Sequence, residues 1–134
     1  MDRSAETPKP RQLELVHPRR DERIAQAIEL MRSALHECWT VSKLARRVGL
    51  SRPAFARRFV ADRGVSPLRY LARERMQRAA ELLWRTDWNL AKIAERVGYG
   101  SQFAFNRAFK RHHQQAPGAF RRQARFLPPV LRAA

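Results

Sequence analysis

Apolar residues recur at spacings of three and four along most of the chain, which is typical of helices that bury one face. Ile24, Ile28, Met31 and Leu35 follow this spacing and predict a helix over residues 21–37. No run of alternating apolar and polar residues bounded by hairpin turns interrupts the pattern. The sequence therefore predicts an all-α fold with about seven helices.

The helical pattern is duplicated along the chain. The segment WTVSKLARRVGLSRPAFARRF begins at Trp39, and a matching segment, WNLAKIAERVGYGSQFAFNRAF, begins at Trp88. Trp39 and Trp88 are 49 positions apart, whereas Phe55 and Phe105 are 50 apart, so one residue has been added between these pairs. The change of offset falls in a predicted turn. Two copies of one supersecondary unit are therefore present.

Each copy is predicted to be a helix, a tight turn and a second helix. In the first copy, Thr40 is placed to cap the first helix and Gly49 to end it in a left-handed conformation. Ser51 is placed to cap the second helix, with Pro53 in its first turn. The corresponding residues of the second copy are Asn89, Gly98 and Ser101. A short helix pair joined by a glycine-containing turn indicates a helix-turn-helix unit.

A long helix is predicted between the two units. Ser66 and Pro67 begin it, and it ends near Arg85 after roughly 18 residues, or about 27 Å. Its apolar stripe consists of Leu68, Leu71, Ala72, Met76, Ala79, Ala80 and Leu83. A last helix follows Pro117. The predicted organisation is a tether (1–20), a first helix-turn-helix subdomain (21–66), a linker helix (67–85), a second subdomain (86–124) and a tail (125–134).

The second helix of each copy carries an outward-facing arginine. At about 100° per residue, Phe55 and Phe59 define the buried side of the first of these helices, and Arg57 points away from them. The same construction places Arg107 at the centre of the exposed face in the second copy. Arginine can pair bidentately with guanine or clamp a phosphate, so both are predicted to contact nucleic acid. Phe103 flanks Arg107, where it either touches a thymine methyl or folds back on the turn.

The charge balance indicates a polyanionic partner. Lys and Arg number 28 against 12 Asp and Glu, which gives a net charge of +16, and residues 97–134 contain no acidic residue. Helix N-termini and basic side chains bind phosphate, so phosphate contacts are predicted for Thr40, Lys43, Arg58, Asn89, Lys92, Lys110 and Arg111. The charge alone fits a non-specific basic binder of nucleic acid or anionic membrane equally well. The duplicated caps and turns favour sequence-specific binding of nucleic acid over non-specific binding.

An enzyme is the first rival class. His36, Glu37 and Cys38 are adjacent, but one cysteine without further convergent groups builds neither a nucleophile nor a metal site. We therefore expect no catalytic residue, metal or cofactor, and we expect Cys38 to be a buried thiol at a helix end. Neither a membrane-spanning run nor a secretory signal is present, which predicts a soluble, cytoplasmic protein.

The block from Thr40 to Gln123 resembles the C-terminal DNA-binding domain of the AraC/XylS transcription regulators. The matching segments are LARRVGLSRPAFARRF, GVSPLRYLARERMQRAAELL and IAERVGYGSQFAFNRAFKRHHQQAPGAFRR. In that family the early residues of each recognition helix, with the arginine near its middle, enter successive major grooves. By position, the resemblance implies base contacts for Arg52, Pro53, Ala56, Arg57, Gln102, Phe103, Asn106 and Arg107.

The resemblance implies a sequence-specific regulator of transcription, such as an activator, located at the bacterial nucleoid. One chain would bind an asymmetric site on double-stranded DNA as a monomer unless it is part of a longer chain, with RNA polymerase as a partner. Longer members carry an N-terminal effector or dimerisation domain, and residues 1–20 look like the tether that would follow one. Gln114 stands where the family usually has glycine, so the second recognition helix is expected to run on or end loosely. An interaction module built on Trp84, Trp88 and the tail is a further alternative.

Overall fold

The computed structural model describes residues 20–125 of the chain. The first 19 residues of the predicted tether and residues 126–134 of the predicted tail lie outside this range. The described part contains seven helices and no strand, so the predicted all-α fold is confirmed. The helices are α3 (Glu22–Ser33), α4 (Val41–Arg47), α5 (Arg52–Arg63), α6 (Pro67–Arg85), α7 (Leu90–Arg96), α8 (Gln102–His113) and α9 (Pro117–Ala124).

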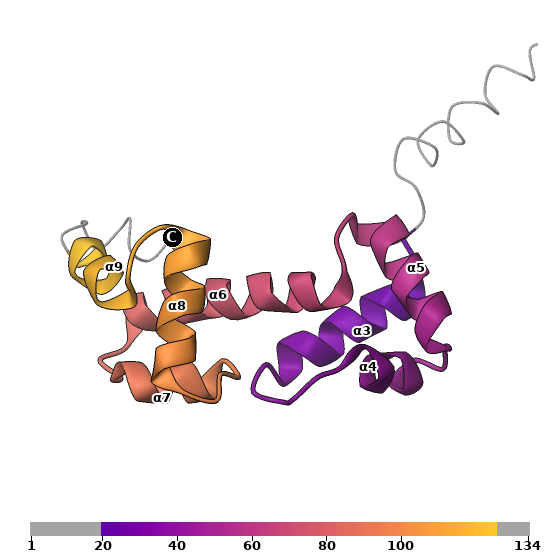
Figure 1. Ribbon diagram of the computed structural model, residues 1–134, viewed down its shortest axis with the longest axis horizontal. Coiled ribbons are helices and arrows are strands. Elements are labelled where there is room, and N and C mark those ends of the chain that lie inside the picture. The colour runs from indigo at the N-terminus through magenta and orange to yellow at the C-terminus, as the bar shows by residue number, and fades with distance from the viewer. Residues whose placement is uncertain (1–19, 126–134) are drawn as a thin grey trace, which may run out of the picture.

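Helix α6 joins two groups of three helices (Figure 1). Helices α3, α4 and α5 pack around one end of it, and α7, α8 and α9 around the other. Each group has its own hydrophobic core, and α6 contributes Leu71 to the first and Met76, Ala79 and Leu83 to the second. The first of these groups is called the first unit below, and the second group the second unit.

The predicted caps and turns are confirmed in both units. Four N-cap side chains accept a hydrogen bond from the backbone N–H three residues further on: Thr40, Ser51, Asn89 and Ser101. Gly49 and Gly98 have positive φ angles of 75° and 97°. A residue with a side chain rarely adopts such angles, which explains why glycine stands between α4 and α5 and between α7 and α8.

Helix α3 ends earlier than the spacing predicted, at Ser33 instead of residue 37. The backbone carbonyl groups that follow Ser33 accept hydrogen bonds from side chains outside α3. The indole N–H of Trp39 donates to the carbonyl of Ala34 at 2.9 Å, and Arg75 donates to those of Leu35 and Glu37. These contacts replace the intrahelical bonds that would extend α3.

Two predictions about side-chain burial are wrong. Cys38 is exposed, and it lies in the irregular stretch between α3 and the Thr40 cap of α4 instead of at a buried helix end. Leu68 and Ala72 of the predicted α6 stripe are also exposed, Leu68 by 46%. In the first turn and a half of α6, the buried residues are Leu71, which was predicted, and Pro67, which was not. The stripe therefore begins on a narrower face than the periodicity indicated.

Helix α8 ends at the same point as α5, so the alternative that it would run on is wrong. The alternative of a looser end agrees with the caps, because the Gly64 N–H donates to the carbonyl of Val60, whereas no such bond of the Gln114 N–H is found among the described residues. Both helices have 12 residues, and Gln114 ends α8 in the left-handed conformation with a φ of 57°, as Gly64 ends α5 with a φ of 80°. The left-handed conformation costs a residue with a side chain about 1 kcal/mol. The buried Pro117 begins α9 three residues later, so the packing of α9 on α6 and α8 outweighs this cost.

Candidate nucleic-acid interface

Helices α5 and α8, each the second helix of a helix-turn-helix pair (α4–α5 and α7–α8), present the same residue type to solvent. Phe55 and Phe59 of α5 are fully buried, and so are Phe105 and Phe109 of α8. The arginine on the opposite face, at position 57 or 107, is exposed in both. The sequence prediction of which side faces outward is therefore confirmed.

The eight predicted base-contacting residues all lie on these two helices, but they are not equally accessible. Six are exposed, and two are partly buried. The exposed ones are Arg52, Pro53, Arg57, Gln102, Phe103 and Arg107. Of the other two, Ala56 is small, and the Oδ1 atom of Asn106 is out of contact with solvent with no donor among the described groups. The accessible polar groups of the two faces are therefore dominated by three arginines and one glutamine.

Phe103 points away from the protein, and its side chain is 70% exposed. The alternative that it folds back on the turn is wrong, because Tyr99 of the turn packs against Phe105 instead, at 5.9 Å between ring centroids. The guanidinium carbon of Arg107 lies 5.5 Å from the Phe103 ring centroid. This is a cation–π distance, so the two side chains form one exposed pair.

The predicted phosphate-contacting residues at the N-termini of α4 and α7 share one arrangement. Thr40 and Asn89 use their side-chain oxygens as caps for the backbone amides of Lys43 and Lys92. The ammonium group of Lys92 lies 4.1 Å from the ring centroid of the tryptophan that precedes its helix, and that of Lys43 lies 5.9 Å from the matching ring. Lys43 also donates to the carbonyl of Cys38 at 3.1 Å. Each lysine is thus held near the N-terminus of a short helix.

Arg58 differs from the other predicted phosphate contacts because an acidic group already holds it. Its guanidinium donates to both carboxylate oxygens of Asp21 at 2.7 and 2.9 Å. These hydrogen bonds lower the pKa of Asp21 below its usual value. A phosphate at Arg58 would therefore compete with a carboxylate, whereas Lys110 and Arg111 form no ion pair with any described residue.

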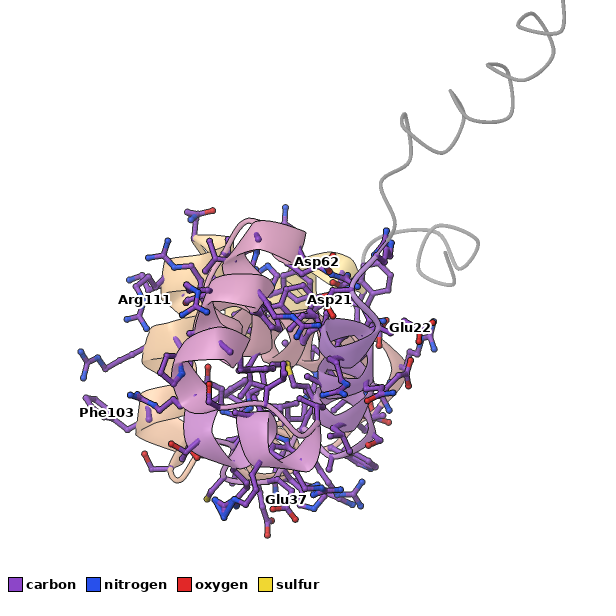
Figure 2. The ribbon with its side chains drawn as sticks, turned by 90° about the vertical axis from the view of Figure 1, so that its right-hand side faces the viewer. Asp21, Glu22, Glu37, Asp62, Phe103 and Arg111 are labelled. Atoms are coloured by element: carbon purple, nitrogen blue, oxygen red, sulfur yellow. The ribbon has the colours of Figure 1, made fainter. Side chains whose placement is uncertain are left out.

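Charge is unevenly distributed over the described surface. From Val97 to Arg125 there is no acidic residue, so nothing within α8 or α9 neutralises their basic side chains. Figure 2 shows Phe103 and Arg111 projecting on one side, whereas Asp21, Glu22 and Asp62 lie away from it. A basic surface with an exposed aromatic ring is typical of nucleic-acid contact.

Several arginines that the charge count assigned to a polyanion have a structural role instead. Arg23 donates to the carbonyls of Val48 and Gly49 at 2.8 and 3.3 Å, at the end of α4. Arg121 donates to those of Leu83 and Thr86, both at 3.2 Å, at the end of α6. Sequence reasoning missed these residues because a bridging arginine and a solvated one have the same local pattern.

The described residues hold no group of three or more His, Cys, Asp or Glu side chains that could bind a metal. His113 lies between the rings of Phe109 and Phe120, with ring centroids 4.3 and 5.6 Å away, and a ring nitrogen lies 3.3 Å from the carbonyl of Met76. It is therefore a packing residue of the second core. None of the helices in residues 20–125 is long and apolar enough to span a membrane.

Residues 44–123 match the family model described as a helix-turn-helix domain. The chain is 36% identical over 110 residues to the HTH-type transcriptional regulator AlkR of Acinetobacter baylyi, covering 82% of this chain and 35% of that protein. It is 38% identical over 115 residues to the RCS-specific HTH-type transcriptional activator RclR of Escherichia coli, covering 86% and 39%. The chain thus spans between about a third and two fifths of the length of these relatives.

Solved structures share the arrangement of the two units. The DNA-binding domain of AdpA, solved in complex with a target DNA, superposes with a TM-score of 0.73 at 33% identity, covering 76% of this chain and 92% of that one. The C-terminal domain of AraT, a response regulator from Geobacillus stearothermophilus, gives a TM-score of 0.75 at 30% identity, covering 78% and 88%. Both matches extend over most of the described residues.

Proposed function

The chain belongs to the family of AraC-type helix-turn-helix regulators, and we propose that it is a sequence-specific DNA-binding regulator of transcription. Helices α5 and α8 enter successive major grooves of double-stranded DNA. The observation that carries the proposal is the repeated exposed arginine. Arg57 and Arg107 occupy the same position of two helix-turn-helix units, and neither has an ion-pair partner among the described residues.

The dimensions of the molecule are compatible with one face of B-DNA. Helix α6 has 19 residues, which corresponds to about 28 Å at 1.5 Å per residue. Successive major grooves on one face recur about every 34 Å. A bend in the duplex compensates for a mismatch at a cost of a few kcal/mol, on the order of 1–6. The similar AdpA domain was solved in complex with a target DNA, which supports DNA binding by this chain.

The eight surface residues proposed to contact bases divide into two chemically different sets. Helix α5 offers Arg52 and Arg57 beside small or apolar neighbours, and α8 offers Gln102 and Arg107 beside Phe103. Lys43, Lys92, Lys110 and Arg111 hold the phosphates on either side, with Arg58 available after exchange of Asp21. A single chain therefore reads an asymmetric site, with one molecule per duplex. Measuring the mass of the complex by analytical ultracentrifugation tests this stoichiometry.

The decisive experiment is selection of binding sites from random DNA, followed by titration of variants against the selected site. Arg57→Ala and Arg107→Ala should each lose about 1–3 kcal/mol of binding free energy, a 5- to 150-fold loss of affinity, with unchanged far-UV circular dichroism. Arg78→Ala is the matched control, because Arg78 is an exposed arginine of α6 paired with Glu81. Unchanged affinity in both Arg57→Ala and Arg107→Ala would refute the proposal that these arginines contact bases.

The rival function is a non-specific basic binder of nucleic acid. It predicts equal affinity for selected and random duplexes, and equal losses for Arg78→Ala and Arg107→Ala. If the protein is an activator that contacts RNA polymerase, its addition should raise transcription in vitro from a promoter that carries the selected site.

A further inference from the structure

Arg75, in the middle of α6, is bonded to the first unit through two backbone carbonyl groups. Its Nε atom donates to the carbonyl of Leu35 at 3.0 Å, and its Nη2 atom donates to that of Glu37 at 2.8 Å. Both carbonyls belong to the irregular segment between α3 and α4. The planar fork of a guanidinium fixes two acceptors in one orientation, which a lysine ammonium cannot do.

The same guanidinium also touches the second unit. Its central carbon lies 5.9 Å from the ring centroid of Tyr99, which follows the turn glycine Gly98. A Cβ atom at Gly98 would lie 2.4 Å from the carbonyl oxygen of Leu35 and 2.7 Å from both the Nε and Nη2 atoms of Arg75. The turn of the second unit, the loop of the first unit and Arg75 therefore meet at one point.

The contacts of Arg75 and Gly98 connect the first unit to the second. Helices α3, α4 and α5 pack on one another, and α5 packs on α6, whereas α7, α8 and α9 all pack on α6. In residues 20–125 no helix of one unit packs extensively on a helix of the other. A hollow of about 230 Å³ separates them nearby, lined by Leu35 and His36 of the first unit and Trp88 and Arg96 of the second. The contact at Arg75 is thus small, and the two units have separate hydrophobic cores.

The matching position of the first unit has a different environment. A Cβ atom at Gly49 would approach Arg23 of its own unit, at 3.3 Å from the Nη1 atom, and no atom of the second unit. The close approach at Gly98 is therefore not a property of the turn itself. Partial burial lowers the pKa of the Arg75 guanidinium. Its hydrogen bond to Leu35 is partly buried, which strengthens it, whereas the bond to Glu37 is exposed.

We propose that Arg75 is a positioning residue for DNA recognition: it locks the two units together and thereby sets which spacing between two half-sites one molecule accepts. This inference rests on the proposed function. Arg75 acts through the orientation of α5 and α8, since its donors face backbone carbonyls. Without this lock, the units would be joined only through the packing of each on α6, and the loop of the first unit could shift relative to the turn of the second.

The first experiment uses the selected DNA site and versions in which the segment between its half-sites is one base pair shorter or longer. One base pair changes the separation by about 3.4 Å and rotates one half-site by about 35°, because B-DNA repeats every 10–10.5 base pairs. The wild type should lose affinity at both altered spacings by about tenfold or more, as for one mismatched contact. Arg75→Ala and Arg75→Lys should bind the original site less tightly and reduce that discrimination at least threefold.

Arg78→Ala is the control, because Arg78 lies on the next turn of α6 and lines the same hollow, but pairs with Glu81 of its own helix. It should leave the spacing preference unchanged. If Arg75→Lys binds more weakly but keeps the wild-type ratio between spacings, Arg75 contributes stability alone and the inference is overturned.

A second experiment tests the lock without DNA, so that its outcome does not depend on the proposed function. Spin labels at Val60 of α5 and Lys110 of α8, both exposed, report the distance between the helices in a Cys38→Ser background. We expect one narrow distance distribution in the wild type and a distribution at least twice as broad in Arg75→Lys. Equal widths would overturn the inference. A wild type that does not distinguish the selected site from random DNA would instead refute the proposed function.

Discussion

Replacing thymine by deoxyuridine in the half-site under α8 removes one methyl group from the DNA and tests the role of Phe103. The ring is 70% exposed and stands beside Arg107, so it is placed to contact a base edge next to the guanine that the arginine would read. Burying one methyl group contributes about 0.8 kcal/mol. We therefore expect the wild type to bind about fourfold more weakly to one uridine-substituted site.

Phe103→Ala should cost more than the loss of the DNA methyl group. It removes the methyl contact, about 0.8 kcal/mol, and the cation–π contact that orients Arg107, about 0.5–1 kcal/mol at an exposed site. The sum of about 1.3–1.8 kcal/mol corresponds to a 9- to 20-fold loss of affinity. Because the ring is exposed in the free protein, the free energy of unfolding should fall by no more than about 1 kcal/mol, the size of the cation–π contact that is lost.

The assay is a double-mutant cycle between protein and DNA, measured by fluorescence anisotropy at constant salt. Wild type and Phe103→Ala are titrated against the selected site and against versions in which each thymine is replaced in turn. We expect one thymine under α8 at which the wild type loses affinity and the variant does not. Thymines under α5 are the control, since Pro53 holds the matching position. Equal losses for both proteins at every thymine, or a selected half-site under α8 without thymine, would refute the reasoning.

Three further predictions concern residues away from the base-reading face. Lys43→Ala should reduce the slope of log affinity against log salt by about 0.9 without changing the selected sequence, and a changed sequence would contradict a phosphate contact. Gln114→Gly should raise the free energy of unfolding in urea by about 1 kcal/mol, because Gln114 has a φ of 57°. Gly64→Ala should lower the free energy of unfolding by a similar amount, because Gly64 has a φ of 80° and a Cβ there meets nothing within 4 Å, which leaves backbone strain as the cost. An unchanged free energy of unfolding in either variant would contradict backbone strain. Because Arg58 lowers the pKa of Asp21 from 3.8 in the folded state, the carboxylate stabilises the protein above about pH 4 and loses this effect as the pH falls through the lower, folded value. Urea unfolding of Asp21→Asn should therefore show a deficit at pH 7 that shrinks below pH 4, and a deficit independent of pH would contradict the ion pair.

Features that depend on neighbouring residues could be predicted from the sequence. The caps at Thr40 and Ser51 and the left-handed turn at Gly49 follow from local hydrogen bonding and steric limits, and the structure contains all three. Helical periodicity likewise identified the buried faces of α5 and α8. The outward direction of Arg57 and Arg107 follows directly from those faces, because a helix turns by a fixed angle per residue.

Features that depend on distant contacts could not be predicted. The hydrogen bond from Arg75 to Leu35 spans 40 positions, and that from Arg23 to Val48 spans 25. A guanidinium that bonds a backbone carbonyl needs no particular residue type at the acceptor, so no pattern in the sequence marks the pair. The early end of α3 has the same origin, since it depends on donors from Trp39 and Arg75.

The two units conserve their interiors and differ at their surfaces, which bears on the shape of the DNA site. The paired phenylalanines that bury α5 and α8 are identical, whereas Pro53 corresponds to Phe103 and Ala56 to Asn106. A core substitution disturbs every neighbour, but an exposed one changes the contacts of that face alone. The faces could therefore diverge while the frame that spaces them stayed the same. Under the proposed function, two half-sites with different base preferences follow, and their difference fixes the direction in which the bound protein faces along the DNA.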